Sequence, residues 1–465
     1  MPRVTSRPGL PRAENSRRSS GGVRSAAVPV PSQPERKGVG ACQLDPRPRG
    51  CHTPCRSPAL KVPARDDLEM TDVDFFRKAS QAYLAGVGTS SLLWQYVKYG
   101  LDDVELPPSD IAARMVTALQ HHPRSAVAPR EAALGREILQ WMKEEWAERG
   151  WTLPPTPLDD LPPTEPLAVS YKTYLGWGRG RSLDDGVTLL ESRGGITHNT
   201  TGMMTWSGAA VLAEWATENP ELLAGRRVLE LGAGAGFTAA VLLTTPHERV
   251  GPPTAYTATD CNPLALALLH HNLHINVAAD QPASEELAAF QQEMDRVLAA
   301  EDDADSEEVK PWTPPLQECH PGGATVVPGC DLGGDGWKTE VGVMQLDWCR
   351  PRPLPPVDVV VAADVVYAHS LIPPLLALIR SILQSPASDL PPGAPPGETP
   401  GEKAAYIACT RRTHETMGVF LEEVARQGLA YKQIYQSSLD IHHAVFTINE
   451  THRPVKVFKI TLSGE

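Results

Sequence analysis

The sequence has no long apolar run, no excess of positive charge and no secretory segment, and each absence excludes a class of protein. No stretch approaches the roughly 18 consecutive apolar residues of a membrane-spanning helix, so we expect no membrane span. The formal net charge is −13, which argues against a general nucleic-acid-binding protein because such proteins need a basic surface. No secretory apolar segment follows Met1, so the eight cysteines are not expected to form a disulfide framework. Hydrophobic residues nevertheless make up 41% of the 465 residues, enough for a sizeable core.

The positive charge that is present is concentrated at the start of the chain. Residues 1–65 carry thirteen basic and three acidic residues and are rich in proline, serine and glycine. Such a segment buries too little apolar surface to offset its ordering entropy, so we predict that residues 1–69 form a disordered basic tail. A transit peptide is the alternative, although several prolines interrupt any amphipathic helix there. Met70 opens a cleaner segment, MTDVDFF, which makes the tail a candidate dispensable extension.

Two cysteines in the tail, Cys51 and Cys55, have a spacing seen in zinc sites. No second pair of ligands follows them in the tail. We therefore expect an incidental cluster and no bound metal.

Three segments follow the tail. In residues 70–153 apolar side chains recur at helical spacing, as in REAALGREILQWMKEEW, and predict a small N-terminal helical domain. Residues 154–166 form a proline-rich linker. From 167 to 465, short apolar strands alternate with helices, which is typical of an α/β domain with a parallel sheet covered on both faces.

The strands and helices of this α/β domain are predicted from its apolar runs. The expected strands lie at 226–232, 255–260, 341–346, 357–367 and 404–410, and the expected helices at 235–243, 262–276, 371–383 and 413–427. The last two strands, 429–436 and 455–462, have no helix between them and predict an antiparallel hairpin. Residues 278–340 are acidic and rich in glycine and proline, so we expect a disordered acidic insert, although Glu285–Ala299 could extend a helix. Residues 385–403 are expected to form a loop.

The motif LELGAGAG, residues 229–236, carries the main functional signal. Glu230 ends a buried strand, and Gly232, Gly234 and Gly236 make the turn into a helix, where backbone approaches a ligand closely. A carboxylate at this position repels a pyrophosphate but suits a cofactor with a positive charge, such as S-adenosylmethionine. A tight structural turn is the alternative.

Polar and aromatic residues follow the next two strands. Asp260 closes the second strand, where a carboxylate can hold ribose hydroxyls; the alternative is a cap on the helix that begins at Asn262. Asp347 can accept a hydrogen bond from an adenine amino group and Trp348 can cover the ring, unless they are a turn acid and a core residue. Trp206 either covers the cofactor or simply packs.

The segment AADVVY, 362–367, follows the fourth strand and points to the acceptor. Asp364 and Tyr367 are expected at the carboxyl edge of the sheet, where ligands bind. A lysine amine has a pKa of about 10.4 and must lose a proton before it attacks, so a carboxylate that holds it is useful. Ordinary packing of a surface loop is the alternative for both residues.

Together these motifs resemble the class I S-adenosylmethionine-dependent methyltransferases, and D-V-V-Y resembles the signature of the family-16 protein lysine methyltransferases. The segment from TTGMMTW to LELGAGAGFT is similar to the group that methylates eukaryotic elongation factor 2, the FAM86 family. The resemblance covers roughly 90–280 and 341–462, and it implies a Rossmann-like seven-stranded sheet with an antiparallel C-terminal hairpin. It assigns the substrate motif to Asp364 and Tyr367, and cofactor contacts to Trp206, Glu230, Gly232, Ala233, Gly234, Asp260, Trp348 and Ala363.

The resemblance implies a protein-lysine N-methyltransferase. From the substrate and the missing secretory segment we expect it in the cytoplasm, and we expect a monomer. S-adenosyl-L-methionine would be the cofactor, elongation factor 2 the protein substrate, and no metal, nucleic acid or membrane would take part. Three alternatives stay open: a family-16 enzyme with another acceptor such as a chaperone or histone, a non-catalytic binding module on the same fold, and an NAD-dependent oxidoreductase.

Overall fold

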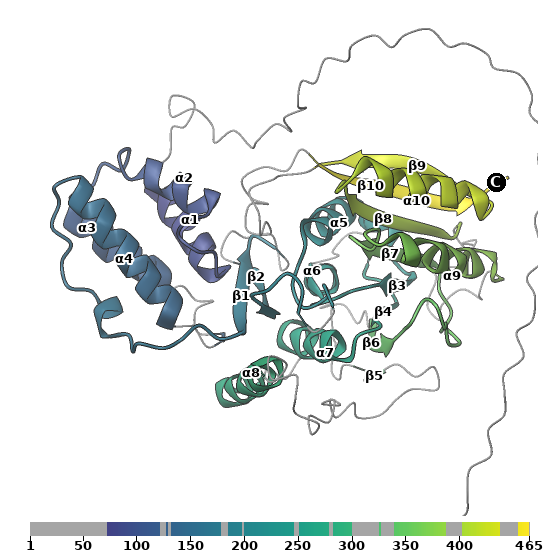
Figure 1. The fold of residues 1–465 in the computed structure, drawn as a ribbon, viewed down its shortest axis with the longest axis horizontal. Coiled ribbons are helices and arrows are strands. Elements are labelled where there is room, and N and C mark those ends of the chain that lie inside the picture. The colour runs from purple at the N-terminus through teal and green to yellow at the C-terminus, as the bar shows by residue number, and fades with distance from the viewer. Residues whose placement is uncertain are drawn as a thin grey trace, which may run out of the picture. The chain divides into compact units, whose positions relative to one another are not determined.

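The structure is a computed structural model that describes eleven stretches of the chain (Figure 1). The described stretches are residues 72–120, 127–128, 132–177, 185–197, 200–245, 251–278, 282–299, 325–326, 339–386, 402–437 and 454–464. The predicted tail, with Met70 and the two tail cysteines, lies outside the described residues, as do most of the acidic insert and of the 385–403 loop.

Four helices in the first part of the described chain share one apolar core. They are α1 (Asp72–Leu84), α2 (Leu92–Gly100), α3 (Pro108–Gln120) and α4 (Ala132–Glu148). Helix α2 begins where the Ser91 side chain accepts a hydrogen bond from the backbone N–H of Trp94, which satisfies a donor at the helix N-terminus. The Trp94 ring then packs against Trp141 of α4, with 4.9 Å between ring centroids. Large aromatic side chains thus make up much of the apolar surface that this small bundle buries.

The proline-rich segment after α4 packs against that helix. It contains a short 3-10 helix, η3 (Pro157–Asp160), in which Leu158 is buried in the helical core. Asp159 forms an ion pair with Lys143 of α4 at 3.0 Å. The segment connects the two parts of the chain, and its two leucines, Leu158 and Leu161, pack in the core of the bundle.

An eight-stranded mixed sheet forms the rest of the fold, in the order β5-β6-β4-β3-β7-β8-β10-β9. Its strands are β3 (Arg227–Leu231), β4 (Ala255–Asp260), β5 (Thr325–Val326), β6 (Glu340–Gln345), β7 (Val359–Ala363), β8 (Ala404–Thr410), β9 (Leu429–Gln436) and β10 (Val455–Leu462). The five central strands are parallel, and β10 runs antiparallel to both β8 and β9. This arrangement confirms the predicted Rossmann-like seven-stranded sheet with its antiparallel C-terminal hairpin. The two-residue strand β5 adds a short antiparallel edge that was not predicted.

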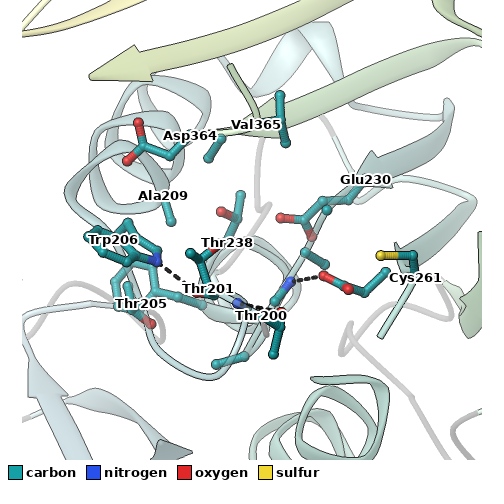
Figure 2. A pocket seen from close by; sticks show the side chains of 18 of the residues that line it. Thr200, Thr201, Thr205, Trp206, Ala209, Glu230, Thr238, Cys261, Asp364 and Val365 are labelled. Atoms are coloured by element: carbon teal, nitrogen blue, oxygen red, sulfur yellow. Dashed lines mark hydrogen bonds between the residues drawn. The ribbon is translucent and has the colours of Figure 1, made fainter. Parts of the chain in front are cut away.

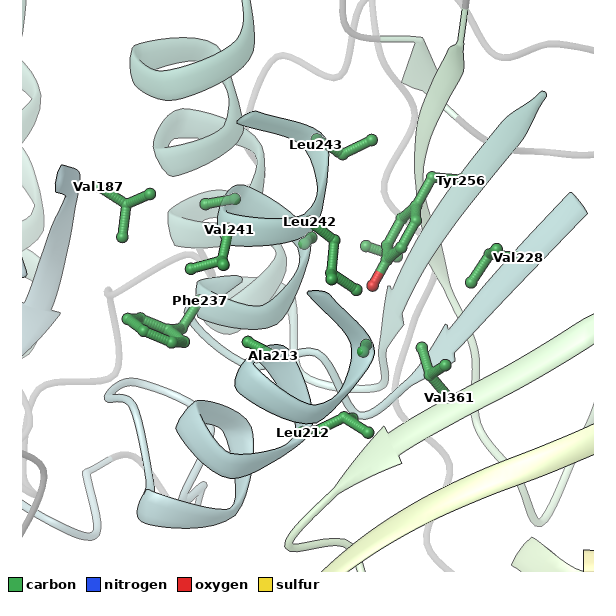
Figure 3. Close-up of a cluster of buried hydrophobic side chains, with 14 of the residues drawn as sticks. Val187, Leu212, Ala213, Val228, Phe237, Val241, Leu242, Leu243, Tyr256 and Val361 are labelled. Carbon is green, nitrogen blue, oxygen red and sulfur yellow. The ribbon is translucent and has the colours of Figure 1, made fainter. Parts of the chain in front are cut away.

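Helices cover both faces of the sheet, as the almost wholly apolar strands require. The remaining described helices are α5 (Ser207–Glu218), η5 (Pro220–Leu222), α6 (Phe237–Thr244), α7 (Pro263–Val277), α8 (Ser284–Ala299), η7 (His369–Leu371), α9 (Ile372–Gln384) and α10 (His414–Arg426). Residues of α5, α6 and α7 form one apolar cluster with the sheet, and residues of α9 and α10 form another. In Figure 3, Leu212 of α5 and Leu242 of α6 lie beside Val228 and Tyr256 of the sheet. None of the described helices combines the length and apolar character needed to cross a bilayer.

A second, two-stranded sheet precedes the large one and was not predicted. Strands β1 (Val169–Leu175) and β2 (Gly186–Ser192) pair antiparallel along seven residues each. Almost every side chain of this hairpin is buried, so its strands lack the polar–apolar alternation of a half-exposed strand. Leu175 packs in the core of the helical bundle, and Val187 packs with the helices on the large sheet.

Residues 278–340 were expected to be a disordered insert in which Glu285–Ala299 could extend a helix, and the structure has that helix. Residues Ser284–Ala299 form helix α8, whose apolar side chains lie in a buried cluster with β1 and α7. Met294 is fully buried, and the Asp295 carboxylate accepts a hydrogen bond from the backbone N–H of Ala168 at 2.6 Å. The periodic apolar face of this segment therefore decides its structure, although the insert as a whole is acidic.

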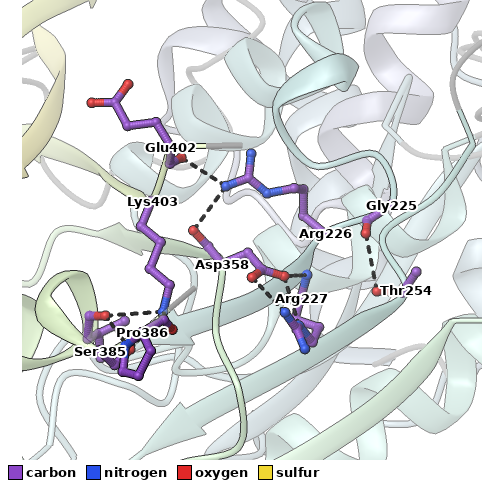
Figure 4. Close-up of polar contacts among 10 residues, drawn as sticks. Gly225, Arg226, Arg227, Thr254, Asp358, Ser385, Pro386, Glu402 and Lys403 are labelled. Atoms are coloured by element: carbon purple, nitrogen blue, oxygen red, sulfur yellow. Dashed lines mark hydrogen bonds and ion pairs between the residues drawn. The ribbon is translucent and has the colours of Figure 1, made fainter. Parts of the chain in front are cut away.

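An ion pair joins two neighbouring strands at their amino ends, at the edge of the sheet opposite the glycine turn. The Arg227 guanidinium donates two hydrogen bonds of 2.8 Å to the Asp358 carboxylate, and the Arg227 backbone N–H donates a third. Figure 4 shows this pair beside Arg226, which donates to the Asp358 and Glu402 carbonyl oxygens. Burial favours the neutral acid, but the hydrogen bonds from Arg227 outweigh it and lower the pKa of Asp358. The bidentate pair therefore ties β3 to the start of β7.

Candidate active site

A pocket opens at the carboxyl edge of the large sheet, where the chain order reverses between β3 and β7. Ligands of open α/β sheets bind at such switch points. The pocket encloses about 890 Å³, part of it open to solvent. Every predicted site residue except Gly236 lines it: Trp206, Glu230, Gly232, Ala233, Gly234, Asp260, Asp347, Trp348, Ala363, Asp364 and Tyr367.

The backbone N–H groups of the glycine turn between β3 and α6 form hydrogen bonds with other parts of the protein. Gly232 and Gly234 have φ of 67° and 53°, which favours glycine, and a Cβ at Gly234 would lie 2.9 Å from the carbonyl oxygen of Gly202. The backbone N–H of Ala233 donates to the Thr259 carbonyl oxygen at 2.8 Å, and that of Gly234 donates to Asp260 at 3.2 Å. These N–H groups are therefore not directed at a phosphate, unlike those of a phosphate-binding turn.

Gly236 has a different role from the other two glycines. It lies outside the lining of the pocket and occupies the N-cap position of α6, with φ of 90°. A Cβ there would come within 2.6 Å of Leu269 of α7. The left-handed backbone at the start of α6, together with the contact to α7, and not contact with the pocket, favours this glycine.

Glu230 lies at the floor of the pocket and is almost completely buried. Its carboxylate accepts a hydrogen bond of 2.8 Å from the Tyr256 hydroxyl. Burial raises the pKa of Glu230 to about 7, against the opposing effects of Tyr256 and of the Thr238 hydroxyl, and the charge of Asp260 raises it further. Thr238 Oγ1 is buried and makes no hydrogen bond of normal geometry within the described part of the chain. Figure 2 shows Thr238 beside Glu230 in the middle of the pocket. A cation in the pocket would restore the charged form of Glu230.

Asp260 links the glycine turn to the end of β4. Its carboxylate accepts hydrogen bonds from the backbone N–H groups of Gly234, at 3.2 Å, and of Asn262, at 3.0 Å. The cap of α7 is made by the Asn262 side chain, which accepts from Leu264 and Ala265. The capping alternative for Asp260 is therefore wrong, and this carboxylate faces the pocket.

Asp347 and Trp348 combine both interpretations that the sequence left open. The Asp347 carboxylate accepts a hydrogen bond of 2.8 Å from the Cys349 backbone N–H, as a turn acid does, and it also lines the pocket. Trp348 packs against the apolar cluster under α9 while its ring covers Gly232, where a Cβ would lie 3.4 Å from the indole. The two residues thus form one polar and one aromatic wall at the β4–β6 side of the pocket.

Asp364 follows β7 and has the only left-handed backbone among the described non-glycine residues, with φ of 52°. Its Oδ1 accepts from the Thr410 N–H at 2.8 Å, and its Oδ2 accepts from the Gly208 N–H at 2.9 Å and the Thr410 hydroxyl at 3.0 Å. A Cβ on Gly208 would collide with this carboxylate at 2.6 Å. Strained backbone of this kind clusters at functional sites. Tyr367 lies three residues later at the mouth of the pocket and is 40% exposed.

The segment 200–206 forms a wall that the sequence indicated only at Trp206. Thr200, Thr201, Gly202, Met204 and Thr205 all line the pocket. The Trp206 indole N–H donates to the Thr201 carbonyl oxygen at 2.8 Å, and the Arg412 guanidinium lies over the ring at 4.7 Å from its centroid. Figure 2 shows Trp206 and Asp364 on one side of the pocket and Glu230 and Cys261 on the other. The run TTGMMTW was the available signal for this wall.

The charge of the pocket selects the kind of ligand that fits. Four carboxylates line it, from Glu230, Asp260, Asp347 and Asp364, and its described lining contains no lysine, arginine or histidine. A pyrophosphate would be repelled there, whereas a cationic nucleoside is attracted. The acidic lining of the pocket and the raised pKa of Glu230 therefore fit a sulfonium cofactor with an amino group better than NAD.

The chain is similar to known protein-lysine methyltransferases along most of its length. It is 27% identical to the Bos taurus protein-lysine N-methyltransferase EEF2KMT over 388 residues, which cover 83% of this chain and 96% of the relative. It is also 27% identical to the Chaetomium thermophilum protein-lysine N-methyltransferase EFM3, over 70% of this chain and 75% of the relative. No sequence profile of a known family matches the chain. These relatives confirm the resemblance to the protein-lysine methyltransferases of this group.

Among solved structures, the fold is similar to Pyrococcus horikoshii TYW2 in complex with MeSAdo. That likeness has a TM-score of 0.32 at 9% identity and covers 69% of this chain and 82% of the other. It is too distant to bear on the function of this protein.

Proposed function

We propose that this protein is an S-adenosylmethionine-dependent protein-lysine N-methyltransferase that acts on elongation factor 2. The observation that carries the proposal is the pocket at the β3–β7 switch point, lined by four carboxylates and no basic residue in the part described. The similarity to the EEF2KMT relatives supports both the reaction and the substrate.

Within this proposal, three of the four carboxylates of the pocket have separate partners on the cofactor. Glu230 would face the amino group, Asp260 would hold the ribose hydroxyls, and Asp347 with Trp348 would bind the adenine. Gly232, Ala233, Gly234, Trp206 and Ala363 would bring backbone and ring faces close to it. S-adenosylmethionine, when bound, supplies a methyl group activated by the positive charge on its sulfur.

The acceptor lysine would enter beside Tyr367 and Asp364. Both Asp364 oxygens already accept hydrogen bonds from the protein, and Oδ1 accepts only one, so it keeps an accepting position. A carboxylate fixed in this way keeps a negative potential at the mouth that attracts and aligns the lysine ammonium. The ammonium proton would pass to water at the open mouth before the neutral amine attacks the methyl group. Tyr367 would form the wall along which the aliphatic part of the lysine passes.

The remaining parts of the proposal concern partners and place. We propose a monomeric enzyme in the cytoplasm, where it meets a protein substrate, with the helical bundle α1–α4 contributing to substrate recognition. Neither nucleic acid nor membrane is part of the reaction.

A methyl-transfer assay with purified components tests the proposal. The full chain is incubated with labelled S-adenosylmethionine and purified elongation factor 2, and modified lysines are located by mass spectrometry. We expect label on a lysine of elongation factor 2 with the native protein, and a loss of at least about 100-fold with Asp364→Ala.

Asp358→Asn provides a matched control for that variant. Asp358 also accepts three hydrogen bonds, but it lies at the opposite edge of the sheet, so its variant should keep the transfer rate at moderate temperature. Cofactor binding without any label on elongation factor 2 would contradict the substrate. The same assay on a whole-cell lysate would then show whether a chaperone or a histone is the acceptor, or whether the fold only binds.

A further inference from the structure

The β1–β2 hairpin contacts two walls of the pocket although it belongs to neither. On the side of β2 that faces away from β1, the backbone forms hydrogen bonds with side chains of α7 and not with another strand. The Asn272 amide accepts from the Leu190 N–H at 2.7 Å and donates to the carbonyl oxygens of Leu190, at 3.0 Å, and of Ala235, at 2.8 Å. Asn276, one turn later, pairs with Thr188 in the same way. Because Ala235 lies in the glycine turn, Asn272 connects the hairpin to that wall.

Glu191, the next residue of β2, is completely buried and accepts hydrogen bonds from three side chains. Its Oε2 accepts from the Lys172 ammonium at 3.1 Å and from the Tyr174 hydroxyl at 2.9 Å, both on β1. Its Oε1 accepts from the Thr205 hydroxyl at 2.5 Å. Burial, and then the charge of Glu191, raises the pKa of Tyr174 well above its ordinary value, so this hydroxyl remains a donor. Burying a carboxylate costs free energy unless its oxygens accept hydrogen bonds. The three hydrogen bonds to Glu191 meet this need and hold its side chain in one conformation.

Thr205 carries the effect of Glu191 to the ligand. Thr205 lines the pocket and precedes Trp206, whereas Glu191 does not line it. The rest of the 200–206 segment is held mainly through its backbone: the Ser192 N–H donates to the Met203 carbonyl oxygen at 2.8 Å, and Gly202 lies against the glycine turn. Without the Glu191–Thr205 bond, the Thr205 side chain would keep only its interaction with the Tyr174 hydroxyl, and its wall would lose a fixed position.

We propose that Glu191 is a positioning residue of the cofactor site. It fixes Thr205, and through Thr205 the 200–206 wall, so cofactor affinity depends on a carboxylate that the cofactor does not touch. This inference rests on the proposed function, because it takes S-adenosylmethionine and its product as the ligands of the pocket.

The test measures the affinity of S-adenosylhomocysteine by titration calorimetry, with the thermal unfolding temperature recorded for each variant of the full chain. We expect Glu191→Gln to weaken binding about tenfold or more, and Thr205→Val to weaken it comparably. The double variant should bind no worse than the weaker single variant, because both changes break one bond. Thr205→Ser keeps the hydroxyl and should bind within about twofold of the native protein.

Glu145→Gln is the control for a general loss of stability. Glu145 is a buried carboxylate held by two cations, Lys98 and Arg149, in the helical bundle. Its variant should unfold at a lower temperature with unchanged affinity. If Glu191→Gln does not fold, Glu191→Asp keeps the charge near Lys172 but is one methylene too short for Thr205, and it should show the same loss of affinity.

Two results would overturn the inference: affinity within about twofold of native for the Glu191 variant that folds, or effects of Glu191→Gln and Thr205→Val that simply add. Failure of the proposed function gives a different result, since the native protein itself would then not bind S-adenosylhomocysteine.

Discussion

Cofactor binding should depend on pH through Glu230. In the free protein, burial raises the pKa of this carboxyl to about 7, above its ordinary value of 4.5. The folded protein therefore holds a proton on Glu230 between these pH values that the unfolded chain has lost, and this contribution to stability disappears as the pH rises through 7. A bound cation favours the ionised form of Glu230 instead, so the protein releases this proton when the cation binds.

The size of the effect follows from the shift in pKa. If the bound cofactor keeps Glu230 ionised, the apparent affinity falls nearly tenfold for each unit of pH below about 7. From about pH 7.5 to about pH 5.5 the loss is about 25-fold, or about 1.9 kcal/mol. Isothermal titration with S-adenosylhomocysteine across this range measures it directly.

Glu230→Gln separates this effect from other titrating groups. The amide has nearly the same shape but carries no charge, so the variant should bind weakly and with little dependence on pH in this range. A flat profile for the native protein, or the same slope in native protein and variant, would refute the assignment of Glu230 to the cationic end of the ligand.

Three further predictions concern other parts of the molecule. Gly234→Ala should abolish cofactor binding measured by calorimetry, because its Cβ would meet the Gly202 carbonyl oxygen at 2.9 Å in a left-handed turn; native affinity would show that the turn is not rigid. Asp358→Ala should lower the free energy of unfolding by about 2–3 kcal/mol in denaturant titrations, because it removes the ion pair with Arg227. This loss should become smaller in acid, where Asp358 of the native protein becomes protonated, and an equal loss at every pH would exclude the ion pair. Met294→Ala should destabilise the protein by about 2–4 kcal/mol and expose α8 to proteases, whereas no change would mean that α8 does not pack.

The strands of the large sheet were predictable because their signal is local. The β8, β9 and β10 bounds match the expected ranges, since continuous or alternating apolar runs there end at glycine, proline or charged residues. Their order along the sheet needed the resemblance to a known family, since no residue pattern states which strands are neighbours.

The unpredicted parts depend on contacts between distant segments. The β1–β2 hairpin, which was not predicted, is stabilised by Asn272 and Asn276 of α7, roughly 80–90 positions later in the chain. Helix α8, which the sequence offered only as a possibility, bonds to Val169 of β1, more than a hundred positions earlier. The places of Glu230 and Asp260 in the pocket were predictable, because each lies at the carboxyl end of a strand of the sheet, and their contacts with a cofactor stay a prediction. The wall at 200–206 was largely missed, because threonines and a glycine in a loop give no pattern until Glu191 and the glycine turn are seen to hold them.

The central claim is that the cofactor lies across the carboxyl ends of β3 and β4. A crystal structure of the full chain with S-adenosylhomocysteine tests it most directly. The account predicts the ribose hydroxyls on Asp260, the amino group facing Glu230 and the adenine between Asp347 and Trp348. A pocket that stays empty at saturating ligand, or a ligand bound elsewhere on the sheet, would contradict it.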